Sequence, residues 1–361
     1  MIQAHYQGVI IPYRNYVGKK FDEIKEKIEL DQKQDTGVEP VGSDINIQFN
    51  STYLEVLDKA YNWRGGINFF SIGLFLMSIF GMTMMLLIIP KVGWDILNLF
   101  IVFLLFSIFF LVYKTLLKND LFGYTHYPIR FNRKNKKVYV FKSKDDIRIF
   151  DWDSLKVAVT LITIDHKNKD HDIRFGQLDE NGLIVDTFCL PYLTSTRAIY
   201  TEEDGYQFIN EIENLNAASN WEYIRCYMEE DVEISYQAVR GLVPLDKKRE
   251  SLLQSMKVAW YFIHLTYSFK EVETTNGTEY LVDIQQTYHN NFLAMIVKGL
   301  GFFIILILFI GRPFVMYIAK RPKWSKAVEE ACVVDPNDQY NYEKFPNQGR
   351  VKLEVRHKPP N

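Results

Sequence analysis

The chain has 361 residues and a formal net charge of -2 at pH 7, and 15 % of its residues are aromatic. This length allows two or three folded units with a sizeable core. The near-neutral charge argues against a protein built mainly to bind nucleic acid, so any basic patch must be local.

The first 66 residues are predicted to form an N-terminal cytoplasmic segment. Thr52 and Glu55 have the spacing of a capping box, which predicts a helix over residues 53–63. At the end of this helix, Trp63 and Arg64 are expected to act as anchors at a membrane interface, because aromatic and basic residues favour that region.

Two uncharged apolar runs follow, at residues 67–89 and 96–113. As a helix the first run would be about 35 Å long, against about 30 Å for the hydrocarbon core of a bilayer. Residues 67–117 are therefore predicted to form a transmembrane helical hairpin. A stripe of small residues on the first helix is expected to pack on the second; it consists of Ser71, Ser78 and Gly81.

Basic residues near the helix ends predict the orientation of this hairpin. Lys91 lies in the short loop, whereas Lys118 and several other basic residues lie on the flanks. By the positive-inside rule, the loop faces outward and both flanks are cytoplasmic. Trp94 and Lys118 are expected as further interfacial anchors.

Residues 118–250 change to an alternation of apolar and polar residues, which is typical of antiparallel strands. Six strands are predicted, within residues 127–133, 136–143, 146–152, 154–164, 171–180 and 182–192. The sequence Asp-Glu-Asn-Gly at 179–182 is a hairpin turn signal. A helix opened by Thr201 and another capped by Asn220 follow; Trp221, Ile224 and Met228 share one face of the second. The pattern favours a cytoplasmic, pleckstrin-homology-like β domain with a C-terminal helical region. This is an analogy of fold, and it does not predict a ligand.

The turn between the first two of these strands is strongly basic. Alternation places its neighbouring apolar residues in the core and sends the basic ones outward. We expect five residues to contact an anionic membrane surface: Arg130, Arg133, Lys134, Lys136 and Lys137. A specific lipid or protein site is the open alternative. Nucleic acid is disfavoured, because the aromatic side chains face inward and cannot stack on bases.

The C-terminal part is predicted as an interfacial helix and a membrane segment over residues 251–319, followed by a basic-aromatic polar tail at 320–361. The densest apolar stretch, residues 299–311, is short for a straight crossing. One crossing, two crossings or a re-entrant segment all stay open, as does the side of the tail. Four further interfacial anchors are expected: Arg312, Lys320, Arg321 and Trp324.

No sequence motif proposes a reaction. Cys189, Cys226 and Cys332 lie far apart and have neither zinc-binding nor disulfide spacing, so we expect buried thiols. Nucleotide-binding, hydrolase, metalloprotease and kinase motifs are absent from the sequence. We therefore expect a non-enzymatic protein with no catalytic residue, no cofactor and no metal ion.

Three stretches carry a family resemblance: STYLEVLDKAYNWRGG (51–66), YPIRFNRKNKKVYVF (127–141) and GRPFVMYIAKRPKWSKAVEEACVVDPNDQY (311–340). Through them the chain resembles a family of uncharacterised bacterial multi-pass membrane proteins, often encoded near type VI secretion effectors. The resemblance implies location in the inner membrane and transfers no catalytic residue.

The function expected from the residues and the resemblance together is an inner-membrane immunity or accessory factor of such an effector. The expected partners are membrane lipids and a toxin or secretion component, without nucleic acid. Two alternatives stay open. One is a membrane-tethered scaffold whose β domain binds lipid headgroups or a cytoplasmic protein, and the weaker one is a transporter component.

Overall fold

The structure is a computed structural model. It describes residues 16–24, 27–38, 40–42, 46–58, 61, 66–92, 96–112, 123–165, 168–190, 215–239, 242, 245, 252, 255, 268–274, 277–283, 311–341 and 352–353.

A five-stranded antiparallel sheet joins residues from both sides of the helical hairpin. Its strands, in spatial order, are β2 (Asn46–Phe49), β3 (Tyr53–Val56), β4 (Ile129–Asn132), β5 (Lys137–Ser143) and β6 (Asp146–Asp151). β3 pairs with β4, with Leu54 opposite Phe131. The segment before the hairpin is therefore part of the same sheet as the segment after it.

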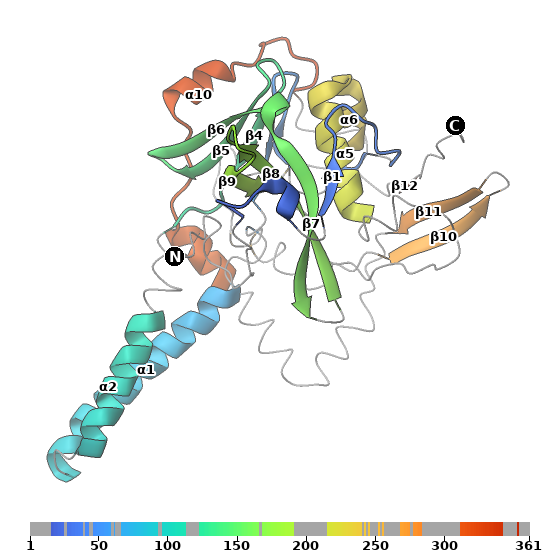
Figure 1. Cartoon of the computed structure of the whole chain (residues 1–361). Helices are drawn as coiled ribbons and strands as arrows, with labels where there is room; N and C mark the ends of the chain where they lie inside the picture. The colour runs from blue at the N-terminus through green and yellow to red at the C-terminus, as the bar shows by residue number, and fades with distance from the viewer. Residues whose placement is uncertain are drawn as a thin grey trace.

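A four-stranded antiparallel sheet has the order β1 (Lys27–Leu30), β7 (Lys156–Asp165), β8 (Asn168–Leu178) and β9 (Ile184–Cys189). A short helix, η1 (Phe21–Glu23), precedes β1, and η4 (Trp152–Ser154) connects β6 to β7. A small third sheet contains β10 (Ser268–Thr274), β11 (Gly277–Asp283) and β12 (Lys352–Leu353). In Figure 1 the β10–β11 hairpin lies to one side of the two larger sheets.

The six strands predicted between residues 127 and 192 are confirmed as β4 to β9. The predicted turn at 179–182 is confirmed as well. The Asp179 carboxylate accepts hydrogen bonds from the backbone N–H groups of Asn181 and Leu183, and Gly182 has a φ of +75°. A residue with a side chain would be strained at that φ, which explains the glycine.

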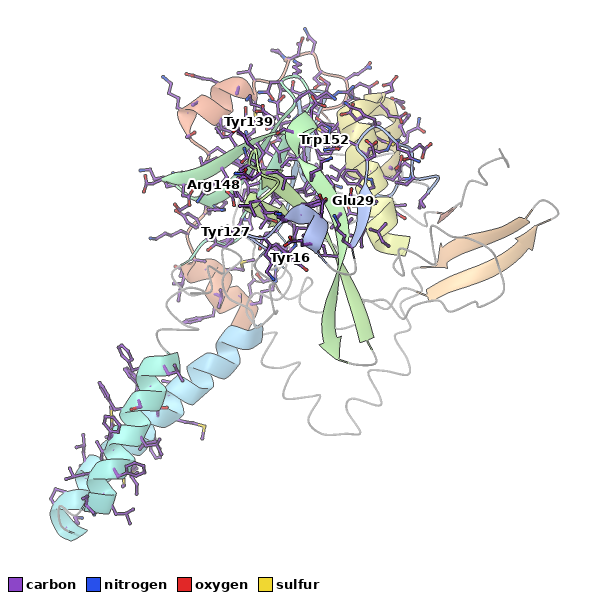
Figure 2. All side chains as sticks on the ribbon, in the orientation of Figure 1. Tyr16, Glu29, Tyr127, Tyr139, Arg148 and Trp152 are labelled. Carbon is purple, nitrogen blue, oxygen red and sulfur yellow. The ribbon has the colours of Figure 1, made fainter. Side chains whose placement is uncertain are left out.

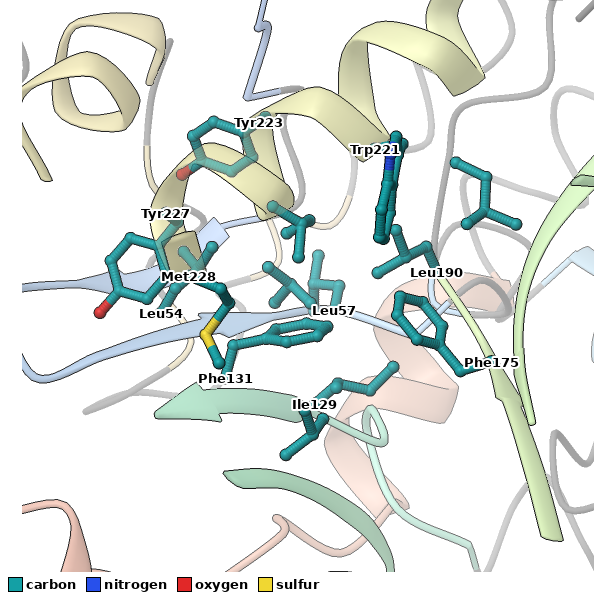
Figure 3. Close-up of a cluster of buried hydrophobic side chains, with 14 of the residues drawn as sticks. Leu54, Leu57, Ile129, Phe131, Phe175, Leu190, Trp221, Tyr223, Tyr227 and Met228 are labelled. Carbon is teal, nitrogen blue, oxygen red and sulfur yellow. The ribbon is translucent and has the colours of Figure 1, made fainter. Parts of the chain in front are cut away.

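The main core lies between the sheets and helix α5 (Leu215–Glu229), with α6 (Val232–Ala238) beside it. Trp221 and Met228 of α5 project toward Phe131 and Phe175 of the two sheets (Figure 3). The predicted apolar face of this helix, which also includes Ile224, is confirmed. Asn220 lies inside α5 and does not cap it, and the predicted helix that begins at Thr201 falls outside the described residues.

The helix predicted over residues 53–63 is wrong in its first half, because Tyr53–Val56 form β3. All four residues of this strand are buried. The signal read as a capping box belongs instead to the β2–β3 turn, where the Asn50 side chain accepts hydrogen bonds from the N–H groups of Thr52 and Tyr53. Pairing with β2 and β4 overrides the local helix signal, as tertiary context often does.

Helices α1 (Gly66–Val92) and α2 (Ile96–Val112) form a hairpin that extends away from the sheets (Figure 1). The predicted packing of small residues is confirmed for Ser78, which is 4 % exposed, and for Gly81, where an added Cβ would lie 3.3 Å from Leu105. The side chain of Ser71 lies outside the described residues.

The prediction that this hairpin spans a membrane is corrected. Within the part of the chain that the structure describes, no helix combines the length and the apolar character that a crossing requires. α2 has 17 residues. Residues 256–267 and 292–310 of the predicted C-terminal membrane region lie outside the described residues.

The predicted fold class and location are corrected with it. In place of a membrane protein with a pleckstrin-homology-like domain at 118–250, the structure is an α+β fold with two larger antiparallel sheets that recruit strands β1 to β3 from before the hairpin. The predicted multi-pass location in an inner membrane loses its support for the same reason.

Candidate functional site

The basic β4–β5 turn caps the end of α5. Arg133 Nη2 donates to the backbone oxygen of Glu230 at 2.7 Å, and Lys136 Nζ donates to the backbone oxygen of Met228. Lys136 also pairs with the Glu229 carboxylate at 3.1 Å. The last carbonyls of a helix lack intrahelical partners and lie at the negative end of the helix dipole, so cations stabilise them.

The other basic residues predicted at a membrane surface have different surroundings. Lys137 pairs with Asp151 across β5 and β6 at 2.9 Å, and Lys134 is exposed. Arg130 is only 3 % exposed, so the prediction that it faces solvent is wrong. Most of the basic residues of this region therefore form hydrogen bonds or ion pairs with other residues of the same chain.

Arg130 is the centre of a buried charged cluster on the outer face of the five-stranded sheet. Its guanidinium donates to the Glu55 carboxylate, with Nη2 at 2.6 Å from Oε2. The rings of Tyr53 and Trp324 lie 4.2 and 4.8 Å from the guanidinium carbon, and Trp324 also donates to Glu55. Burial alone would lower the pKa of Arg130, but the charge interactions with Glu55, Tyr53 and Glu329 together outweigh it and raise the pKa.

This cluster is covered by residues 320–341, which we call the C-terminal strap. Its helix α10 (Lys326–Ala331) is capped by Ser325, whose side chain accepts from the backbone N–H of Val328. Asn132 of β4 donates to the backbone oxygen of Ala331 at 2.8 Å, and Glu329 lies 3.5 Å from Arg130. The three stretches that carry the family resemblance thus meet at Arg130.

Four of the predicted interfacial anchors lie among the described residues, and each of them contacts another part of the chain. Arg312 is 1 % exposed and donates to the backbone oxygen of Tyr61 at 3.0 Å. Arg321 donates to the backbone oxygen of Leu245 at 3.0 Å, and the backbone of Lys320 forms a bridge with Tyr124. Trp324 lies in the Arg130 cluster. Four predicted anchors fall outside the described residues: Trp63, Arg64, Trp94 and Lys118.

Glu229, at the end of α5, connects three further segments. Its carboxylate accepts from Lys33 at 2.7 Å, from Lys136 at 3.1 Å and from the indole N–H of Trp152 at 2.5 Å. Burial alone would raise the pKa of Glu229, but the hydrogen bonds from these three donors outweigh it and lower the pKa. The carboxylate is therefore held in its charged form as a structural link.

This lowered pKa predicts a dependence of stability on pH. A carboxyl whose pKa is lower in the folded state stabilises the fold above its unfolded value, about 4.3, and loses this contribution as the pH falls through the folded value. We expect the difference in free energy of unfolding between the wild type and Glu229→Gln to be largest near pH 6 and to shrink toward pH 3. Urea titrations over this range measure it, and a difference that stays constant with pH would contradict the assignment.

Within the described residues, no group of three or more histidine, cysteine, aspartate or glutamate side chains could hold a metal ion. The expectation of buried thiols is confirmed, because all three cysteines are free and buried. Burial raises the pKa of the Cys226 thiol, and the nearby Glu222 carboxylate adds to this effect. A thiol with a raised pKa is a poor nucleophile.

Sequence reasoning missed Glu55, Trp152 and Asp338 as contact residues. Glu55 is 75 positions from Arg130, and Asp338 is 287 positions from its partner Ser51. A pattern in a local window carries no signal for such pairs. The resemblance was the available signal, because its three stretches contain Glu55, Arg130 and Trp324.

The described residues define an α+β protein with two larger antiparallel sheets, internal charged clusters, a C-terminal strap and a projecting apolar helical hairpin. The chain belongs to DUF6708, a family of unknown function, whose family model matches residues 102–336. The predicted membership of an uncharacterised family is thereby confirmed. No curated protein and no solved structure matches the chain.

Proposed function

We propose that the protein is a non-enzymatic binding protein that acts as an immunity or accessory factor of a type VI secretion effector. The secretion context rests on the resemblance carried by the three stretches that meet at Arg130. Neutralising an effector requires affinity and correct placement against it, and it requires no chemical step.

The observation that carries the proposal is the exposed apolar surface of the α1–α2 hairpin. Met77, Phe103 and Ile96 are 72, 67 and 88 % exposed. Figure 2 shows the side chains of both helices standing outward along the hairpin. Monomeric proteins rarely expose large contiguous apolar patches, and such patches mark interaction sites. Other large apolar side chains of this surface are Leu76, Phe80, Leu87, Leu97, Phe100 and Leu111.

The charged clusters support binding over catalysis. Arg130 is engaged by Glu55, and Glu229 is engaged by three donors. Arg225 is held by Glu222 at 2.5 Å and by Glu230 at 2.6 Å. Groups that are fully engaged in ion pairs are suited to structural roles, whereas a catalytic acid, base or nucleophile needs access to its substrate.

The second candidate function is a scaffold whose β domain binds another protein. The observation that favours it is the strap, because a chain segment already lies across the outer face of the five-stranded sheet, on side chains of the types that dominate protein interfaces. Tyr53, Arg130 and Trp324 belong to the residue types enriched at interface hot spots.

Co-expression with a candidate type VI secretion effector tests the proposal. We expect the wild-type chain to restore growth of cells that express the effector. The double variant Phe100→Asp and Phe103→Asp should lose this protection, because it places two charges on the apolar surface. Ile149→Asp is the matched control, since Ile149 is 53 % exposed on β6, away from the hairpin.

Immunoblotting must show that all variants accumulate equally. Full protection by the hairpin double variant would remove the role of the hairpin surface. Failure of the wild type to protect against the effector would contradict the immunity function itself.

A further inference from the structure

One corner of the five-stranded sheet contains hydrogen-bond donors that lack acceptors. It lies where the β2–β3 turn meets the end of β4 and the end of α5, and we call it the donor corner, made of Asn50, Ser51 and Arg133. The Oδ1 atom of Asn50 accepts from two backbone N–H groups of the turn. Its Nδ2 atom is buried and has no hydrogen-bond partner among the described residues.

Arg133 contributes the second unfilled donor. Its Nη2 atom donates to the backbone oxygen of Glu230, but Nη1 is buried and has no partner among the described residues. Within the same residues, no carboxylate lies within ion-pair distance of its guanidinium. Buried polar groups are normally hydrogen-bonded and buried charges are normally paired, so this donor is costly to leave unfilled.

Tyr227 of α5 places the two unfilled donors in one neighbourhood. Its hydroxyl donates to the backbone oxygen of Asn50 at 2.8 Å, and its ring centre lies 5.9 Å from the guanidinium carbon of Arg133. The backbone N–H of Arg133 donates to the backbone oxygen of Thr52, two residues from Asn50, at 3.1 Å. The backbone of Asn50 and the guanidinium of Arg133 therefore both lie beside the same tyrosine.

A carboxylate from the C-terminal strap already lies at this corner. Asp338 Oδ2 accepts from the backbone N–H and from the hydroxyl of Ser51, each at 2.7 Å. Its Oδ1 accepts from the backbone N–H of Tyr340 at 2.9 Å. Burial raises the pKa of the Tyr227 hydroxyl. The positive charge of Arg133 offsets part of this rise and the negative charge of Asp338 adds to it, as expected if both charges lie near the hydroxyl.

We propose that the donor corner is a binding site for a carboxylate of an acidic protein segment, and that Asp338 occupies it from within the same chain. Asp338 fills the two donors of Ser51 and leaves Asn50 Nδ2 and Arg133 Nη1 unfilled. An external carboxylate that engages these donors gains charge-assisted hydrogen bonds that the internal occupant does not make. A buried water molecule would fill the donors but leave the charge of Arg133 unpaired. The inference rests on the proposed function in that it takes the partner to be a protein.

Such a site makes Asp338 an internal competitor. A segment tethered in the same chain has an effective concentration in the millimolar range, so it suppresses the binding of external segments that have similar affinity. Removing its charge should therefore open the corner. The strap would remain attached through Trp324 on Arg130, which lies outside the segment that contains Asp338.

The test uses the full chain and two fluorescent peptides, measured by anisotropy. One peptide has the sequence of residues 333–341, and the other is an unrelated peptide of alternating glycine and aspartate. We expect Asp338→Asn to bind both peptides about tenfold or more tightly than the wild type, because the internal competitor is removed.

Variants of the donors complete the design. Adding Arg133→Gln or Asn50→Asp to Asp338→Asn should weaken binding of both peptides about tenfold, whereas adding Lys134→Gln should not. Lys134 is the matched control, since it is an exposed cation of the same turn. Asn50→Asp keeps the oxygen that the turn uses and replaces the unfilled donor by a charged acceptor. Thermal unfolding shows whether each variant is folded.

Each outcome decides the proposal. Binding of both peptides with the expected dependence on Arg133 and Asn50 supports it. Binding of the strap peptide alone would identify the occupant as the strap of a second copy and overturn the proposal. No binding, or binding that ignores both donors, would mean that the corner holds only water. Because no effector is present, these results are independent of the growth assay.

Discussion

Replacing Arg130 by alanine is expected to lower the free energy of unfolding by about 3–5 kcal/mol, the loss typical of removing one partner of a buried ion pair. The side chains of Arg130 and Glu55 are 4 and 8 % exposed. Without the guanidinium, the Glu55 carboxylate would be left buried, while the indole N–H of Trp324 would still donate to it. The strap would also lose the cation on which Trp324 packs.

Urea unfolding of the full-length variants measures this effect. Lys134→Ala, in the adjoining turn, is the control and should change the free energy by no more than about 0.5 kcal/mol. The double variant Arg130→Met and Glu55→Met should be less destabilised than Arg130→Ala, because it leaves no unpaired charge. If Arg130→Ala cost less than about 1 kcal/mol, the cluster would not hold the strap and sheet together.

Replacing Trp152 by alanine is expected to cost about 3–5 kcal/mol, as for other large aromatic residues in cores. Trp152 is fully buried, and its ring centre lies 6.1 Å from those of Phe131 and Phe175 and 5.9 Å from that of Trp221. Figure 2 shows it in the densely packed region of the sheets. It therefore contacts both sheets and α5.

Trp152→Phe separates the two roles of this residue. Phenylalanine keeps an aromatic ring but removes the hydrogen bond to Glu229, so we expect a smaller loss of about 1.5–3 kcal/mol, typical of a hydrogen bond to a charged group. Thermal and urea unfolding of both variants provide the measurement. Equal losses for the alanine and phenylalanine variants would show that the hydrogen bond, and not the packing, dominates.

The strands from residue 127 to 189 could be predicted because each half-buried strand alternates apolar and polar residues in its own sequence. Strands β1 and β3 could not be predicted in this way, because they owe their conformation to distant partners. Leu54 in β3 pairs with Phe131 across the whole hairpin. The length and hydropathy of the runs at 67–113 correctly predicted the two helices of the hairpin. The same properties also predicted a membrane crossing, which the described helices do not support.

Arg130 shows why the candidate site was only partly predictable. Alternation correctly places Arg130 on the face of the sheet opposite to the core. It carries no information on the strap, whose Glu329 is 199 positions away and covers that face. In the same way, the sequence placed Arg133 and Lys136 in a turn, but only the packing of α5 against this turn shows that they cap a helix.

Calorimetric titration of the full-length chain with a purified type VI secretion effector, the proposed partner, tests the proposed binding function most directly. We expect saturable binding, an effector of unchanged mass after incubation, and loss of binding in the variant with Phe100→Asp and Phe103→Asp. Absence of saturable binding, or a covalent change in the effector, would contradict a non-enzymatic binding function.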